Sequence, residues 1–184
     1  MNQFEKSSLY WVLAVLVIII APIIVLLTPV ILSVIVFENP DRIAFITFGK
    51  NFIIYSLAFF IAFISLVFLY FIKKLITRII VIILTILGFL SVFGLGVNYY
   101  IYLDEDYIEF NPLIGSKAVY EWSELTHVSH IYPNDDSEAE TYTFSFNDGF
   151  SFQFEANGFV DSSVKNKIYN KLKVYDVPLE LNNS

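Results

Sequence analysis

The chain has 184 residues, of which 57% are hydrophobic and 16% charged, against about 45–50% and about 25% in soluble proteins. Residues 1–97 carry six Lys/Arg and three Asp/Glu, whereas residues 98–184 carry five Lys and fifteen Asp/Glu. Such an acidic C-terminal part would repel phosphates, which argues against a nucleic-acid partner. Cysteine is absent, so disulfides and thiolate metal sites are excluded.

The first apolar run covers residues 9–37 and contains no charged residue before Glu38. It is longer than the roughly 20 residues that cross a bilayer core, so we expect a tilted or kinked span, with Pro22 and Pro29 as kink points. Tyr10 and Trp11 would lie at the interface. A cleaved signal peptide is disfavoured, because its apolar region usually has only about 7–15 residues.

Two further uncharged runs, residues 52–72 and 79–97, predict a second and a third span. Residues 73–78 between them are too few for anything but a tight helical hairpin loop. Glycines in the third run would allow close helix contact, although small residues are also common in spans without specific packing. These glycines are Gly88, Gly94 and Gly96.

Charge in the short loops predicts the orientation. Lys73, Lys74 and Arg78 form the densest basic cluster beside any span, so the positive-inside rule places them, and the N-terminus, in the cytoplasm. The 38–51 loop and the C-terminal domain would then lie outside, in a multi-pass protein of the cell membrane. No run contains an Asp, Glu, Lys, Arg or His between its ends, which argues against an ion-coupled transporter and favours an anchor in the lipid bilayer.

After residue 97 the hydrophobic pattern changes to a period of two, which is typical of β-strands. Leu125, Val128 and Ile131 are spaced by three, which indicates either a bulge or a short helical turn at residues 122–125. Residues 133–140 form the longest polar loop. We expect strands over residues 98–103, 106–110, 117–122 and 124–132, followed by a hairpin over residues 141–154.

The hairpin has the clearest signal in the chain. Polar and aromatic residues alternate on both sides of Asn147-Asp148-Gly149, a strong turn sequence. The aromatic face must cover a core or lie on the bilayer surface, and burial is favoured because so large an exposed patch would be a liability in water. This face comprises Tyr142, Phe144, Phe146, Phe150, Phe152 and Phe154.

One amphipathic helix is expected after the hairpin. Asp161 or Ser162 would cap its start, it would run to about Tyr175, and Pro178 prevents its continuation. Its apolar stripe comprises Val164, Ile168, Leu172 and Tyr175. The predicted organisation is a transmembrane region of residues 1–97, a soluble domain of residues 98–178 and a tail of residues 179–184.

Lysines surround the rest of this helix. They either solubilise its outer face, which is the favoured interpretation, or approach anionic lipid headgroups. These residues are Lys165, Lys167, Lys171 and Lys173.

From residue 100 the chain reads YIYLDEDYIEFNPLIGSKAVYEWSELTHV. This stretch resembles the start of the bacterial pleckstrin-homology-like (PH-like) domains of small membrane proteins. These domains typically show an aromatic-rich strand that leaves the last span, an acidic turn, a second strand, a variable turn and a strand that ends in a Trp-containing element. That element appears here as YEWSEL at residues 120–125. The resemblance covers about residues 98–175, and the closing hairpin and C-terminal helix match its later part.

The resemblance implies an α+β domain, a half-open barrel of six to seven antiparallel strands capped by the helix. Six strands are clear, and a seventh could lie in residues 157–160 or within residues 133–140. Eukaryotic members often bind phosphoinositides through basic residues, but the early strands here are acidic, so that activity is not carried over.

No constellation predicts chemistry. His127 and His130 are three apart on a strand, so they should point to opposite faces and could not share a metal without a bulge. The carboxylates Asp135, Asp136, Glu138 and Glu140 lack the EF-hand spacing and read as a solvated loop. The acidic turn of residues 104–106 is equally consistent with carboxylates that are simply solvated at the surface.

An enzyme is not expected, since no nucleophile, phosphate-binding or dinucleotide-binding motif occurs. The weakest hypothesis is a site at the membrane boundary that uses Tyr99, Tyr100 or Tyr102. No catalytic residue, metal site or cofactor is predicted.

The expected function is a non-catalytic binding or scaffold domain at the membrane surface, with the bilayer and an unidentified protein as partners. The alternative is an immunity or transport accessory protein that acts through its transmembrane helices. The sequence leaves the oligomeric state open.

Overall fold

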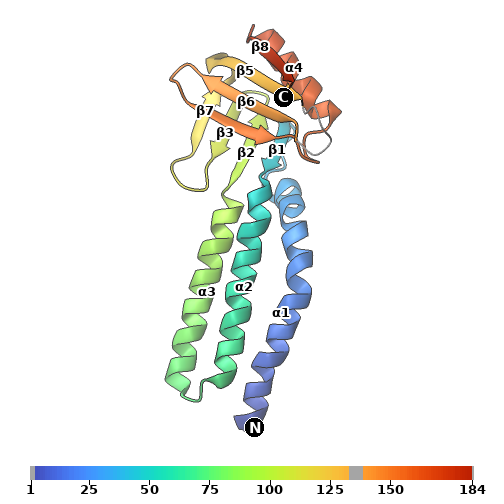
Figure 1. Cartoon of the computed structure of the whole chain (residues 1–184). Coiled ribbons are helices and arrows are strands. Elements are labelled where there is room, and N and C mark those ends of the chain that lie inside the picture. The colour runs from blue at the N-terminus through green and yellow to red at the C-terminus, as the bar shows by residue number, and fades with distance from the viewer. Residues whose placement is uncertain (1–2, 133–138, 184) are drawn as a thin grey trace. The chain divides into compact units, whose positions relative to one another are not determined.

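The computed structural model describes residues 3–132 and 139–183 and consists of two compact units (Figure 1). The first unit comprises Met1–Val36 and Gly49–Asn98, and the second comprises Phe37–Phe48 and Tyr99–Ser184. The chain therefore passes into the second unit between Asn98 and Tyr99, next to the expected boundary at residue 97, but the second unit also takes in residues 37–48, which follow the first helix.

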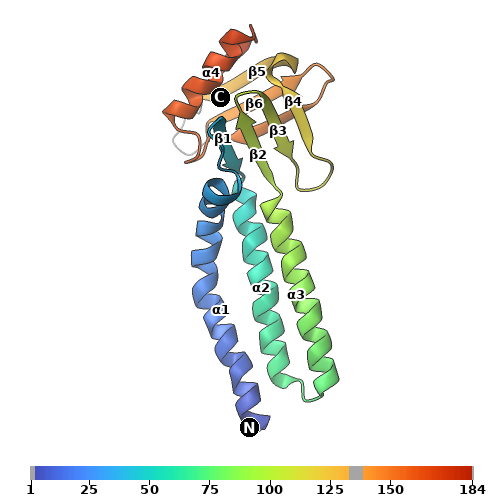
Figure 2. The same ribbon diagram turned by 180° about the vertical axis from the view of Figure 1, so that it is seen from behind.

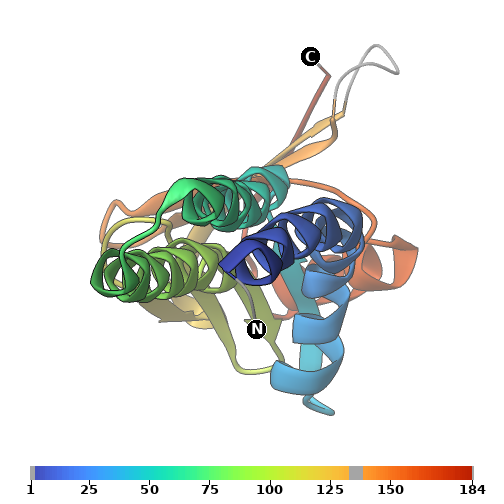
Figure 3. The same ribbon diagram turned by 90° about the horizontal axis from the view of Figure 1, so that it is seen from below.

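The first unit holds three helices, α1 (Gln3–Ile31), α2 (Gly49–Phe71) and α3 (Leu75–Val97). A π-helical turn, Leu32–Val36, extends α1, which stays helical through Pro22 and Pro29. Each helix is long and apolar enough to cross a membrane, as the sequence predicts. Figure 3 looks along the three helices from below.

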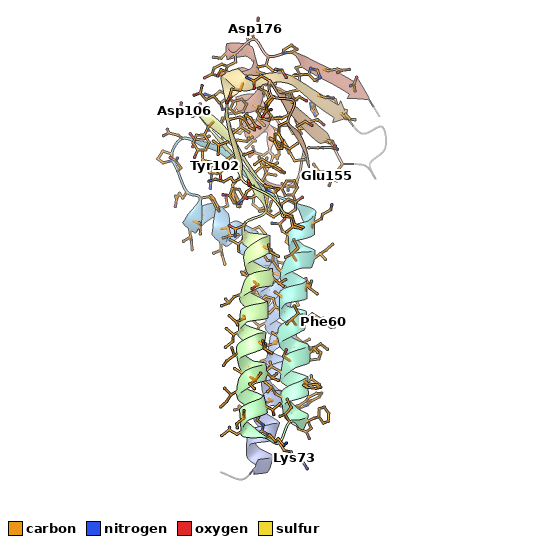
Figure 4. The ribbon with its side chains drawn as sticks, turned by 90° about the vertical axis from the view of Figure 1, so that its left-hand side faces the viewer. Phe60, Lys73, Tyr102, Asp106, Glu155 and Asp176 are labelled. Carbon is orange, nitrogen blue, oxygen red and sulfur yellow. The ribbon has the colours of Figure 1, made fainter. Side chains whose placement is uncertain are left out.

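We expect lipid to surround these helices, because most of their large apolar side chains are exposed. Phe60 is 58% exposed and points away from α2 in Figure 4. Lys73 lies in the short connection of residues 72–74, which confirms a tight loop between two helices. The connection is shorter than the predicted loop of residues 73–78, because α3 already begins at Leu75.

Close packing of α2 on α3 depends on Gly96. The Asn51 side-chain amide and the Tyr55 hydroxyl both donate to the Gly96 carbonyl, at 2.8 and 3.0 Å. A Cβ at Gly96 would lie 2.5 Å from the Tyr55 ring, whereas one at Gly88 would make only ordinary contact and one at Gly94 would meet no atom within 4 Å. Close contact is thus confirmed at one of the three predicted glycines.

The second unit begins with a four-stranded antiparallel sheet, called sheet A (Figure 2). Its strands are β1 (Arg42–Thr47), β2 (Tyr100–Asp104), β3 (Tyr107–Asn111) and β4 (Ala118–Glu121), in that order. The sequence predicts a loop over residues 38–51, and this prediction is wrong for residues 42–47, which form β1.

β1 is a strand because both of its faces are covered. Five of its six residues are buried, and it pairs antiparallel with β2, including Thr47 opposite Tyr100. Ile43 and Ile46 belong to the domain core, and Phe45 stacks on Phe37 with ring centroids 4.4 Å apart. A single short strand flanked by two spans has no distinct periodicity, so its partner decides its conformation.

The second sheet, called sheet B, comprises β5 (Leu125–Tyr132), β6 (Thr141–Phe146), β7 (Ser151–Glu155) and β8 (Leu179–Asn183). Its order is β7-β6-β5-β8, and β8 runs parallel to β5. The predicted tail of residues 179–184 is therefore largely a strand, and the strands are not all antiparallel. The described strands form two sheets rather than a closed barrel.

The predicted hairpin is confirmed as β6 and β7. Tyr142, Phe144 and Phe146 are buried on β6, and Phe152 and Phe154 on β7. Phe150, just before β7, is half-buried against this core. The aromatic face therefore covers the core, as the alternation predicts.

Both predicted irregularities near residue 122 are present. Trp122–Glu124 form a 3-10 turn, and the β5–β6 register shifts between Leu125 and His127. Trp122 is fully buried, and its indole nitrogen donates to the Asp104 carbonyl at 2.9 Å. Residues 158–160 form a turn and bend, so no strand lies there, and residues 133–138 of the predicted polar loop lie outside the described part of the chain.

Helix α4 (Ser162–Val174) covers the core, as predicted. The Asp161 carboxylate caps it by accepting from the Val164 amide at 2.9 Å. Of the predicted stripe, Ile168 and Leu172 are buried, Val164 is half-buried and Tyr175 is 41% exposed.

Candidate functional site

The most unusual polar feature of the second unit is a cluster where β5, β6 and α4 meet, which we call the His130 network. His130 lies on β5, Glu140 directly precedes β6, and Tyr142 lies on β6. Lys165 and Tyr169 come from α4. His130 has no exposed surface.

Every polar atom of the imidazole has a partner. Nε2 lies 2.5 Å from Glu140 Oε1, and Nδ1 lies 2.7 Å from the Tyr169 hydroxyl. Tyr142 donates to the same Glu140 oxygen at 3.1 Å, and Lys165 donates to Glu140 Oε2. The carboxylate thus joins both strands to the helix.

The charge state follows from burial and from these bonds. Burial lowers the pKa of His130 below 6.5, although Glu140 acts in the opposite direction. A neutral ring donates from Nε2 to Glu140 and accepts at Nδ1 from Tyr169. Burial by itself would raise the pKa of Glu140, but hydrogen bonds from Lys165 and His130 outweigh it and hold the pKa below 4.5.

Aromatic rings enclose the imidazole. Its centroid lies 4.0 Å from those of Tyr132 and Tyr142, and it stacks on Tyr142 at 16°. Burial raises the pKa of Tyr142 well above its usual range and that of Tyr169 to about 12. Both phenols therefore stay protonated at neutral pH.

Chemically, the order phenol–imidazole–carboxylate is that of a proton relay. A relay that acts on a substrate must reach it, however, and both nitrogens of the buried His130 ring are already bonded within the domain. The arrangement instead fixes α4 on sheet B. No local sequence pattern predicts the network, because its members are separated by up to 39 residues and only the fold brings them together.

His127 is separated from this network, as the spacing predicts. Its Nε2 lies 3.2 Å from Glu180 on β8, and the side chain is 38% exposed. It pairs across the sheet with Ser145, whereas His130 pairs with Tyr142, so the two rings do not share a partner.

The acidic turn has a structural role. Asp104 is 3% exposed and accepts from the Tyr102 hydroxyl and the Asn39 side-chain amide, each at 3.2 Å. The interpretation of this turn as solvated surface carboxylates is therefore wrong for Asp104. Asp106 lies at the turn between β2 and β3 (Figure 4).

The tyrosines of the membrane-boundary hypothesis are not activated. Burial raises the pKa of Tyr99, Tyr100 and Tyr102, which keeps the phenols protonated. Tyr100 donates at 2.5 Å to Glu109, whose other oxygen accepts from Lys117 at 3.1 Å.

Two of the four helix lysines are held within the domain. Lys165 is paired with Glu140, and Lys171 lies 2.6 Å from Glu105 Oε2. The hypothesis that all four lysines approach lipid headgroups therefore conflicts with these pairs, which favour the structural interpretation for Lys165 and Lys171.

A groove between α1 and α2 is lined mostly by apolar side chains. Its volume is about 480 Å³, and Ser56 is its single hydroxyl-bearing lining residue. Pro22 lies on its α1 side, and Phe59, Phe60 and Phe63 lie on its α2 side. The groove suits a hydrocarbon occupant.

The comparisons with family models, with curated proteins and with solved structures give no match to this chain.

Proposed function

We propose that this chain is a non-catalytic membrane protein whose second unit is a PH-like binding or scaffold domain held at the bilayer surface. The order of its elements supports this proposal. Four strands form sheet A, three further strands begin sheet B, and α4 then covers the core, with β8 as an addition. We propose that the two sheets form a half-open barrel that α4 closes at one end.

One core unites these elements. Ile101 of β2, Phe144 of β6 and Ile168 of α4 are all fully buried in the same hydrophobic cluster. Such a cluster is expected where a helix plugs two packed sheets.

The observation that carries the proposal is the origin of β1. This strand is contributed from between two apolar helices, and β2 begins three residues after α3 ends. Because β1 and β2 pair in one sheet, the domain is tied to the membrane helices at both strands. A domain tethered in this way is suited to holding a partner at the membrane.

The charge of the domain indicates the chemistry of that partner. Residues 37–48 and 99–184 carry seventeen Asp/Glu and six Lys/Arg. We therefore propose a protein partner with a neutral or basic face, and not a nucleic acid.

Photo-crosslinking in native membranes tests the proposal. A photoreactive amino acid would replace Gln153, exposed on β7, or Lys167, exposed on α4, with Leu84, exposed on α3, as the matched control. We expect discrete protein adducts from the β-domain positions and not from the control. Adducts from the control position Leu84 alone, with none from Gln153 or Lys167, would contradict the proposal.

A second candidate function acts through the helices, as an immunity or transport accessory protein. The apolar groove between α1 and α2 favours it. The same experiment with the photoreactive residue at Phe60, which lines the groove, separates the two candidates, since this candidate expects adducts at Phe60 and none at Gln153.

For the orientation, we propose that the N-terminus and the 72–74 connection are cytoplasmic and that the β-domain lies outside the cell membrane. Lys73 and Lys74 in this connection support the assignment through the positive-inside rule.

A further inference from the structure

The connection between β3 and β4, residues 112–117, exposes an apolar tip. Ile114 is 89% exposed, more than any other large hydrophobic side chain in the described residues, and Leu113 beside it is half-buried. A single exposed isoleucine is ordinary on a protein surface. Ile114 differs from such a residue because its loop starts at the end of sheet A where the chain connects to the apolar helices.

Strand register pairs the start of this loop with the residue at which the chain arrives from α3. Asn111, the last residue of β3, pairs with Tyr100, the first residue of β2. Tyr100 follows Val97, the end of α3, by three residues, which reach at most about 11 Å. Paired Cα atoms add about 5 Å.

The neighbouring strand points to the same end of sheet A. Thr47, the last residue of β1, also pairs with Tyr100, and α2 begins at Gly49. Two chain connections to apolar helices therefore leave the sheet at the end where the 112–117 loop emerges. Figure 2 shows the β3–β4 connection at the same end of the sheet as the start of β2.

Aromatic side chains at this end of the sheet are of the kind that favours a membrane interface. Phe48 stacks on Tyr99 with centroids 4.1 Å apart and planes at 11°, and Phe110 contacts Phe48 edge-on at 6.3 Å. Tyrosine in particular is enriched at the headgroup level.

The loop holds its tip in a defined conformation. Pro112 restricts the backbone at the start, and Gly115 has φ of +122°, a conformation that other residues rarely adopt. Lys117 follows the tip, with its side chain 50% exposed and its ammonium 3.1 Å from Glu109. A lysine beside an apolar tip matches the polar–apolar boundary of a bilayer.

We infer that the 112–117 loop enters the lipid interface, with Leu113 and Ile114 against the upper acyl chains. The occupant is lipid because the loop emerges where the chain leaves its apolar helices and carries an apolar tip. This contact is additional to the three spans and independent of any protein partner.

Site-directed spin labelling of the full chain tests this inference, because the chain has no native cysteine. Ile114→Cys carries a nitroxide in nanodiscs of phosphatidylcholine with phosphatidylglycerol. The control is Val174→Cys, which is 75% exposed on α4. We expect the ratio of oxygen to nickel-chelate collisions to be severalfold higher at residue 114 than at residue 174.

Equal ratios at the two positions would overturn the inference. Protection of residue 114 from both reagents would also overturn it, since that result indicates a protein contact. If Ile114→Cys fails to fold, Ser116→Cys on the same loop replaces it, with near-ultraviolet circular dichroism as the check of folding.

Discussion

Single residues decide packing in both units, and Gly96 is the sharpest case. Its carbonyl accepts two hydrogen bonds from α2, and the Tyr55 ring occupies the space where a Cβ would lie. Asn51 and Tyr55 are both fully buried, so the interaction depends on a close backbone approach.

Gly96→Ala should therefore destabilise the helical unit by about 1–3 kcal/mol, the usual cost of overpacking. Gly94→Ala is the matched control, because no atom lies within 4 Å of its added methyl group. Thermal unfolding of the full chain in detergent measures both. Equal melting temperatures for the two variants would show that the close approach is unimportant.

His130 makes a second residue-scale prediction, on pH. In the folded state burial lowers its pKa, so below about pH 6.5 the unfolded chain binds the proton more readily. The free energy of unfolding should fall as the pH drops from 6.5 towards the folded-state pKa. Glu140 adds a further loss only below about pH 4.5. The charged or titratable groups around His130 are Glu140, Lys165, Tyr132, Tyr142 and Tyr169.

The measurement is denaturant unfolding followed by Trp122 fluorescence in a Trp11→Phe background, between pH 7.5 and 5 at about half-unit steps. His130→Gln should flatten the pH dependence between 6.5 and 5, whereas His127→Gln should retain it. A wild-type curve that is flat over this range would refute the prediction.

At the scale of elements, β1 is a strand of the second unit that lies in the chain between two helices of the first unit. Its neighbours in the chain are apolar helices, yet its neighbour in space is β2. Pairing of β1 with β2 also requires that both lie on one side of the membrane that α2 and α3 would cross.

Ile46→Ala should destabilise the β-domain by about 2–5 kcal/mol, as expected for a fully buried isoleucine. Val119→Ala on β4, where the side chain is 51% exposed, should change stability by less than about 0.5 kcal/mol. Denaturant unfolding through Trp122 fluorescence compares them. Equal effects of the two substitutions on stability would contradict the burial of β1 in the core and favour a loop at residues 42–47.

At the scale of the whole molecule, the proposed orientation makes a prediction about cysteine labelling. Lys73→Cys and Val174→Cys should lie on opposite sides of the membrane, with residue 174 reacting with an impermeant maleimide in intact cells and residue 73 only after lysis. Glu38→Cys, near the start of the second unit, should behave like residue 174. Reversed labelling of all three would invert the proposed orientation, and labelling of residues 73 and 174 on one side would contradict the three spans.

Sequence alone predicted the elements whose signal is local. The three spans follow from uninterrupted apolar runs, the β6–β7 hairpin from alternation around Asn147-Asp148-Gly149, and α4 from its cap and apolar stripe. Each needs only a short window of residues, because the periodicity of the side chains matches the geometry of one element.

Only the tertiary structure decided β1, β8 and the His130 network. β1 and β8 are strands because partners distant in sequence supply their hydrogen bonds, and neither has a pattern that separates it from a loop or a tail. His130, Glu140 and Tyr169 come together because β5, β6 and α4 pack around one core. Pairing and burial depend on residues far along the chain, and a local pattern does not contain them.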